Sequence, residues 1–113
     1  MLDAVAGNIE NYMTLLSERQ KLVASNIANA DTPGYKTRDI DFQSELSTAT
    51  ARFQPIATEV QGLTVKNDGN NVNLDRESRL LAENALRFNI ASNLLHSQLK
   101  VVRMAIDGGP SAS

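Results

Sequence analysis

Residues 81–106, LAENALRFNIASNLLHSQLKVVRMAI, decide the fold of this chain. Apolar side chains recur along this stretch at alternating steps of four and three residues, the repeat of one face of an α-helix. The stripe consists of Leu81, Ala85, Phe88, Ser92, Leu95, Leu99, Val102 and Ile106. Asn73 is a predicted N-cap and Gly108 follows the last turn, so the pattern predicts a helix from about residue 73 to about residue 107.

A second long helix is predicted at the other end of the chain, from about residue 3 to about residue 30. Its apolar positions also follow steps of three and four: Leu2, Val5, Ile9, Tyr12, Leu16, Val23, Ile27 and Ala30. Arg19 is a charged residue on this stripe. Pro33 and Gly34 end the helix, because proline disfavours helical dihedrals in the preceding residue and Pro-Gly suits a type II turn.

The segment between the helices is predicted to be irregular. Residues 38–42, RDIDF, alternate as a short extended segment, with Ile40 and Phe42 on one face and Asp39 and Asp41 on a solvent-facing side. Residues 43–52 could form a short helix and residues 63–66 a short strand, while residues 67–71, NDGNN, are typical of a turn. These residues contain too few apolar side chains for a second core.

The pattern as a whole predicts a mainly α fold with long N- and C-terminal helices that pair as a coiled coil, joined by an irregular, short-β middle arm. We expect residues 1–32 and 73–107 to form a helical core domain, residues 33–72 an extended middle arm and residues 108–113 a flexible tail. A second apolar edge flanks the stripe of the C-terminal helix: Leu80, Ala91, Leu94, Val101 and Ala105. Neighbouring chains in an assembly could cover this edge. The alternative is a compact three- or four-helix domain in which the middle segment covers it.

The composition excludes several kinds of site. Cysteine is absent and His96, which lies off the apolar stripe, is the single histidine, so thiolate chemistry and His-based metal sites are excluded. The sequence contains no nucleophile elbow and no phosphate-binding loop. A net charge of -2 without a cluster of basic and aromatic residues gives no nucleic-acid footprint. We therefore predict no catalytic, cofactor-binding or metal-binding residues, no cofactor, and neither a nucleic acid nor a small-molecule substrate as partner.

Membrane and secretion signals are also weak in this sequence. No apolar run approaches the ~18 residues that a transmembrane helix needs. The first 18 residues carry no Lys or Arg, so a cleavable secretory signal is not expected.

Residues 24–36, ASNIANADTPGYK, resemble the N-terminal signature of the flagellar rod, hook and hook-associated protein family. The following TRDIDF, residues 37–42, is similar to the proximal rod members of that family rather than to its hook or distal rod members. NDGNNVNLDRE, residues 67–77, and AENALRF, residues 82–88, are similar to the C-terminal half of the same members. The resemblance therefore includes both ends of the chain.

This resemblance implies a structural subunit, not an enzyme, that self-assembles with other rod proteins in the proximal rod of the bacterial flagellar basal body and transmits torque across the periplasm. It implies further copies of the chain, other rod proteins, the junction protein between MS ring and rod, and the flagellar type III export apparatus as partners. The implied location is the periplasmic rod, reached without a cleaved signal peptide. Two rivals stay open, another rod component such as the middle rod protein and a helical adaptor that binds a partner helix.

The predicted site residues form two sets. Assembly and packing are assigned to stripe residues of both helices: Ile9, Leu16, Val23, Ile27, Leu81, Phe88, Leu95, Leu99 and Val102. The signature turn consists of Ser25, Asn26, Asn29, Pro33, Gly34 and Tyr35. The amide and hydroxyl groups of Ser25, Asn26 and Asn29 can bond free carbonyls at the helix end or groups of a neighbouring subunit. We expect Gly34 to adopt a positive φ.

Overall fold

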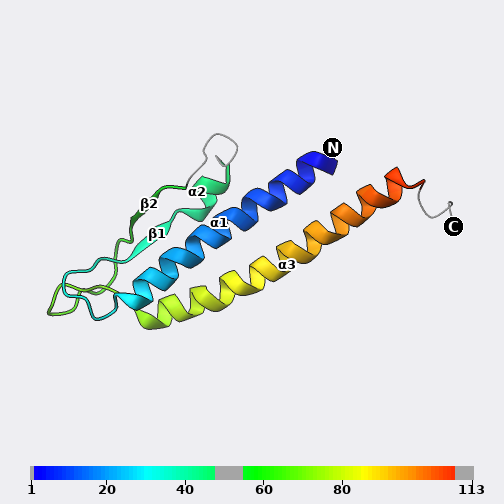
Figure 1. Cartoon of the computed structure of the whole chain (residues 1–113). Coiled ribbons are helices and arrows are strands. Elements are labelled where there is room, and N and C mark those ends of the chain that lie inside the picture. Colours follow the sequence, from blue (N-terminus) through cyan, green and yellow to red (C-terminus); the bar gives the residue numbers. More distant parts are fainter. Residues whose placement is uncertain (1, 48–54, 109–113) are drawn as a thin grey trace.

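Two long antiparallel helices form the frame of the molecule (Figure 1). The computed structural model describes residues 2–47 and 55–108. Helix α1 spans Leu2–Ala28 and helix α3 spans Leu74–Ile106, and they pack against each other over much of their length. The molecule is elongated, with extents of 68 × 26 × 17 Å. The predicted fold, mainly α with paired terminal helices, is confirmed. We call α1 and α3 together the helical hairpin.

The ends of both helices follow local rules. Asn73 caps α3, because its side-chain oxygen accepts a hydrogen bond of 3.1 Å from the backbone N–H of Arg76. Beyond the other end of α3, Gly108 has a φ of 87°. After α1 the chain turns at Gly34, whose φ of 75° is a conformation that glycine adopts without steric cost. The predicted N-cap and the predicted positive φ at Gly34 are confirmed.

The middle segment contributes three short elements. Strand β1 (Arg38–Ile40) pairs antiparallel with strand β2 (Ala57–Glu59), and helix α2 (Phe42–Ser47) lies between them in sequence. Helix α2 begins at Phe42, the last residue of the predicted extended segment, and includes residues 43–47 of the predicted helix 43–52, whose residues 48–52 lie outside the described part. The predicted strand at residues 63–66 does not form, because the partner of β1 is β2.

The middle segment lies along α1 (Figure 1). The ring of Phe42 in α2 meets the ring of Tyr12 in α1 edge to face, with ring centroids 5.4 Å apart. Ile40 of β1 is buried as well. The short elements therefore form a thin second layer on one side of the hairpin.

The face of α3 that packs on α1 differs from the predicted stripe. The buried residues of α3 are Glu77, Leu80, Asn84 and Ala91, so the contact face is rotated by about one residue. Leu81, Phe88 and Leu99 of the stripe retain exposures of 40%, 39% and 53%, whereas Leu16 and Val23 of α1 are buried as predicted. The physical reason is that polar partners fix the rotation: Asn84 donates to Gln20 of α1 and Glu77 accepts from Asn26.

None of the helices in the described ranges combines the length and the apolar character needed to span a bilayer.

Candidate functional site

The end of α1, the start of α3 and strand β1 meet in a buried polar cluster centred on Asn26, which is 1% exposed. The amide nitrogen of Asn26 donates to the backbone oxygen of Arg38 at 2.9 Å and to Oε1 of Glu77 at 3.2 Å. Its oxygen accepts from the hydroxyl of Tyr35 at 2.9 Å and from the backbone N–H of Arg38 at 3.2 Å. The side chain of Asn26, a residue of the signature turn, therefore connects α1, the segment that follows the turn and α3.

Asp39 connects the same three parts through ion pairs. Its carboxylate accepts two hydrogen bonds of 2.9 Å from Arg19 of α1 and one of 2.7 Å from Arg76 of α3. The backbone N–H of Ile40 donates to it at 2.7 Å. The prediction that Asp39 faces solvent is wrong, because the carboxylate is buried between two guanidinium groups. The same carboxylate neutralises the charge of Arg19, the charged residue on the apolar stripe of α1.

These partners also determine the protonation of Asp39. Burial acts to raise the pKa of its carboxyl group. The hydrogen bonds and charge of Arg19, the N–H of Ile40 and the hydrogen bond of Arg76 outweigh burial, so the pKa lies below its ordinary value of 3.8. The carboxylate is therefore ionised wherever the ion pairs are formed.

Glu77 completes the cluster, which we call the helix junction and define by Arg19, Asn26, Tyr35, Asp39, Arg76 and Glu77. Glu77 is fully buried, and its Oε1 accepts a hydrogen bond of 2.8 Å from the guanidinium group of Arg76. Oε2 of Glu77 is buried without a hydrogen-bond partner. The two guanidinium groups and two carboxylates balance in charge, which is the condition for burying them at moderate cost.

The turn at residues 67–71 closes the end of α1. Asn70 is fully buried and donates hydrogen bonds of 2.8 Å to the backbone oxygens of Asn29 and Thr32. The side-chain oxygen of Asn71 accepts from the backbone N–H of Thr37 at 2.6 Å. Both carbonyls belong to the turn that follows Ala28, the last residue of α1, so Asn70 fixes this turn against residues 67–71.

The structure brings most of the predicted signature-turn residues together. Asn29 donates to the backbone oxygen of Ser25 at 2.8 Å, and the Ser25 hydroxyl lies 3.3 Å from the Tyr35 hydroxyl. Pro33 and Gly34 lie at the exposed turn itself. Sequence reasoning did not single out Asn70, Asn71, Arg76 or Glu77 as site residues, although all four fall in the stretch 67–77 that carries the resemblance.

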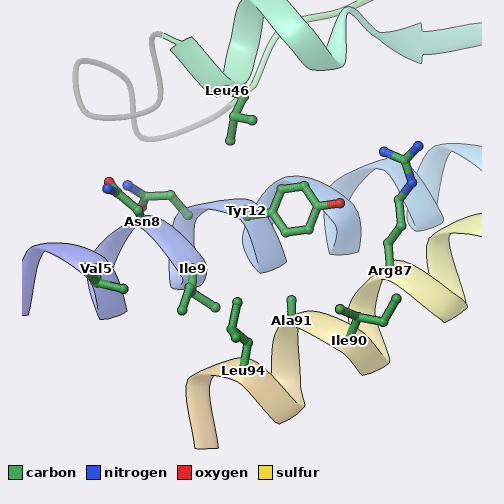
Figure 2. A pocket seen from close by; sticks show the side chains of 10 residues that line it. Val5, Asn8, Ile9, Tyr12, Leu46, Arg87, Ile90, Ala91 and Leu94 are labelled. Atoms are coloured by element: carbon green, nitrogen blue, oxygen red, sulfur yellow. The ribbon is translucent and has the colours of Figure 1, made fainter. Parts of the chain in front are cut away.

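An open apolar groove lies farther along the hairpin, between α1, α2 and α3 (Figure 2). Its volume is about 540 Å³. Ile9 of α1 and Leu94 of α3 point toward one another there, and Leu46 points toward α1 from α2. The other lining residues are Val5, Asn8, Asn11, Tyr12, Arg87, Ile90 and Ala91. We call this surface the apolar groove.

The exposed surface of α3 is strongly apolar and includes Ile90 and Leu94 of the apolar groove. Its large exposed apolar residues are Leu74, Leu81, Leu86, Phe88, Ile90, Leu94, Leu99, Val101, Met104 and Ile106. A monomeric soluble protein rarely exposes an apolar surface of this extent. Among the described residues no group of three His, Asp or Glu side chains is arranged to hold a metal ion. The fold and these surfaces define an elongated helical subunit with a large apolar surface exposed along α3.

Comparison with known proteins identifies the assembly. The model of the flagella basal body rod protein family matches residues 10–36. The chain is 34% identical to the flagellar basal body rod protein FlgB of Salmonella typhimurium and 34% identical to that of Escherichia coli, with alignments covering 96% of both chains in each case. It is 26% identical to FlgB of Bacillus subtilis over 90% of this chain and 92% of the relative.

The chain belongs to the FlgB family of flagellar basal body rod proteins. It is a structural subunit of the proximal rod and not an enzyme, and it assembles with other flagellar basal body proteins. The predicted family is confirmed, and the similarity to FlgB argues against the adaptor and against another rod component.

Proposed function

We propose that the helical hairpin is the packing body of this rod subunit and that neighbouring subunits cover the exposed surface of α3. In this proposal residues 1–32 and 73–107 form one core domain and residues 33–72 a middle arm, whereas the predicted tail lies outside the described residues from residue 109 onward. The exposed apolar side chains along α3 carry the proposal, because no element in the described part of the chain covers them.

The partners that we propose are further copies of this chain, other rod proteins and the junction protein between MS ring and rod. Different faces of α3 are exposed at once, for example at Leu99 and at Leu94, so more than one neighbour is needed to cover them. Contacts between unlike surfaces can continue from subunit to subunit, as a rod requires.

We further propose that the chain reaches the periplasmic rod through the flagellar type III export apparatus and keeps α1. Ile9, Leu15 and Leu16 of α1 are buried, so the hairpin would lose its core if this helix were removed. The mass of the chain's N-terminal peptide in purified basal bodies tests this point.

The helix junction gives the subunit a means to transmit torque. Asp39 ties α1, β1 and α3 together through charge-assisted hydrogen bonds, which are stronger than neutral ones. A load on one helix is therefore passed to the other at the junction as well as along the packed faces.

Complementation tests the proposed function. The chain is produced in a flagellated strain that lacks its own FlgB, and swimming is scored in soft agar. We expect the parent chain to restore swimming and Leu99→Asp to fail, with Asn89→Asp, an exposed polar position on α3, as the matched control. Restored swimming with Leu99→Asp would contradict an assembly role for this face of α3.

A further inference from the structure

The apolar groove and the end of α3 are two unlike surfaces of one chain, and no described residue covers either of them. The groove lies between Val5–Tyr12 of α1 and Arg87–Leu94 of α3, each about 12 Å long at 1.5 Å per residue. The end of α3, residues 99–106, has the same length. It carries Leu99, Val101, Met104 and Ile106, all exposed.

The end of α3 cannot enter the groove of its own chain. Residues 87–94 already form one wall of that groove, and α3 continues from them without a break to Ile106. The helix has 33 residues against 27 in α1, and its last turns extend past the beginning of α1 (Figure 1). No described segment of the same chain fills the groove.

We propose that the apolar groove of one copy of this chain receives the end of α3, residues 99–106, of a neighbouring copy. The proposal rests on the proposed function and names one of its contacts. An apolar helix end laid in a groove between two helices is a common mode of recognition, in which side chains at helical spacing act as anchors. Because groove and helix end are unlike surfaces, the contact is heterologous and can be repeated along an assembly.

The distribution of charge fits this pairing. The α1 wall of the groove, from Val5 to Tyr12, has Glu10 and no basic residue, whereas the end of α3 from Leu99 to Ile106 has no acidic residue. The incoming end carries Lys100 and Arg103, so these basic residues approach Glu10. Arg87, which also lines the groove, pairs with Glu83 at 2.7 Å, and this pair offsets part of its repulsion toward the two basic residues.

Cysteine cross-linking tests the contact, because the parent chain has no cysteine. Two versions, Val5→Cys and Met104→Cys, are produced together in a strain that lacks its own FlgB, and basal bodies are purified and oxidised. Both positions are partly exposed. We expect a disulfide-linked pair on the order of ten times more abundant than with Lys21→Cys in place of Val5→Cys, because a disulfide requires Cα atoms within about 7 Å.

Asn89→Asp added to the Met104→Cys version is a further control and should leave the cross-link unchanged, because Asn89 lies outside both surfaces. Basal bodies that contain both cysteine versions but show no cross-link above the Lys21→Cys control would overturn this contact and leave the rod function intact. If neither version enters basal bodies although each is helical by circular dichroism, the proposed function falls and this contact with it.

Discussion

The side-chain amide of Asn26 in α1 donates a hydrogen bond of 3.2 Å to Oε1 of Glu77 in α3, across 51 positions of the sequence. Both side chains are buried, and Asn26 holds the backbone of Arg38 and the hydroxyl of Tyr35 at the same time. Asn26, a residue of the signature at residues 24–36, therefore forms these hydrogen bonds within the subunit. It fixes where the chain leaves α1 and where α3 begins.

Replacing Asn26 with Ala should destabilise the chain by about 2–3 kcal/mol, because buried donors and acceptors would lose their partner. Urea unfolding followed by circular dichroism measures the change. Asn89→Ala, at an exposed position, is the matched control and should stay within about 0.5 kcal/mol of the parent. Equal stability of the two variants would show that the junction contributes little.

Replacing Asp39 with Asn should lower the free energy of unfolding at neutral pH by about 2–3 kcal/mol, because it leaves Arg19 and Arg76 with a neutral partner. The pKa of Asp39 is lowered in the folded state, so its contribution is present above the unfolded pKa of about 4 and is lost as pH falls through the folded pKa. The difference between parent and variant should therefore shrink below about pH 4. A difference that is constant from pH 7 to about pH 2.5 would contradict the ion-pair account.

Gly34→Ala should destabilise the chain by about 1–2 kcal/mol, the cost of a left-handed conformation for a residue with a side chain. An added Cβ would have no neighbour within 4 Å, so the effect isolates the φ of 75°. Gly34→Val should cost more, since its side chain branches at Cβ. Gly7→Ala, in the interior of α1, should instead stabilise by about 0.5–1 kcal/mol, and thermal unfolding would reveal the opposite signs.

Leu16→Asp and Leu99→Asp should separate folding from assembly. Leu16 is 1% exposed, so a charge there should cost about 4 kcal/mol or more and unfold the purified chain. Leu99 is 53% exposed, so its variant should keep the parent's helical circular dichroism and fail only in rod incorporation. Loss of helicity in both variants would mean that α3 needs Leu99 to fold.

Ile27→Asp and Leu95→Asp should abolish rod assembly. Both side chains lie on the predicted stripes and are only partly buried, so a charge disturbs the hairpin and the surface beside it. Swimming in soft agar is the readout, and normal motility of either variant would refute their assignment to packing.

The sequence predicted the elements with strong local signals. The two helices follow from their apolar repeats, the start of α3 from the N-cap Asn73, and the turn from Pro33 and Gly34. Strand β2 has no such signal, because Ala57–Glu59 shows no apolar alternation and its partner β1 determines its place.

The rotation of α3 and the burial of Asp39 could not be read from periodicity. Leu80 and Leu81 are neighbours on a wide apolar arc, and either could have faced α1. The polar partners of Glu77 and Asn84 decide which face turns inward. Likewise, the alternation of a short strand predicts that Asp39 faces solvent. Its burial depends on Arg19 and Arg76, which lie 20 and 37 positions away in the sequence and pair with it in the fold.

The most direct test of a structural rod subunit is electron cryomicroscopy of basal bodies assembled in a strain that lacks its own FlgB and produces this chain. The account predicts density for the helical hairpin within the proximal rod, with the outer surface of α3 covered by neighbouring subunits. Complete rods in motile cells that contain none of this chain would contradict it.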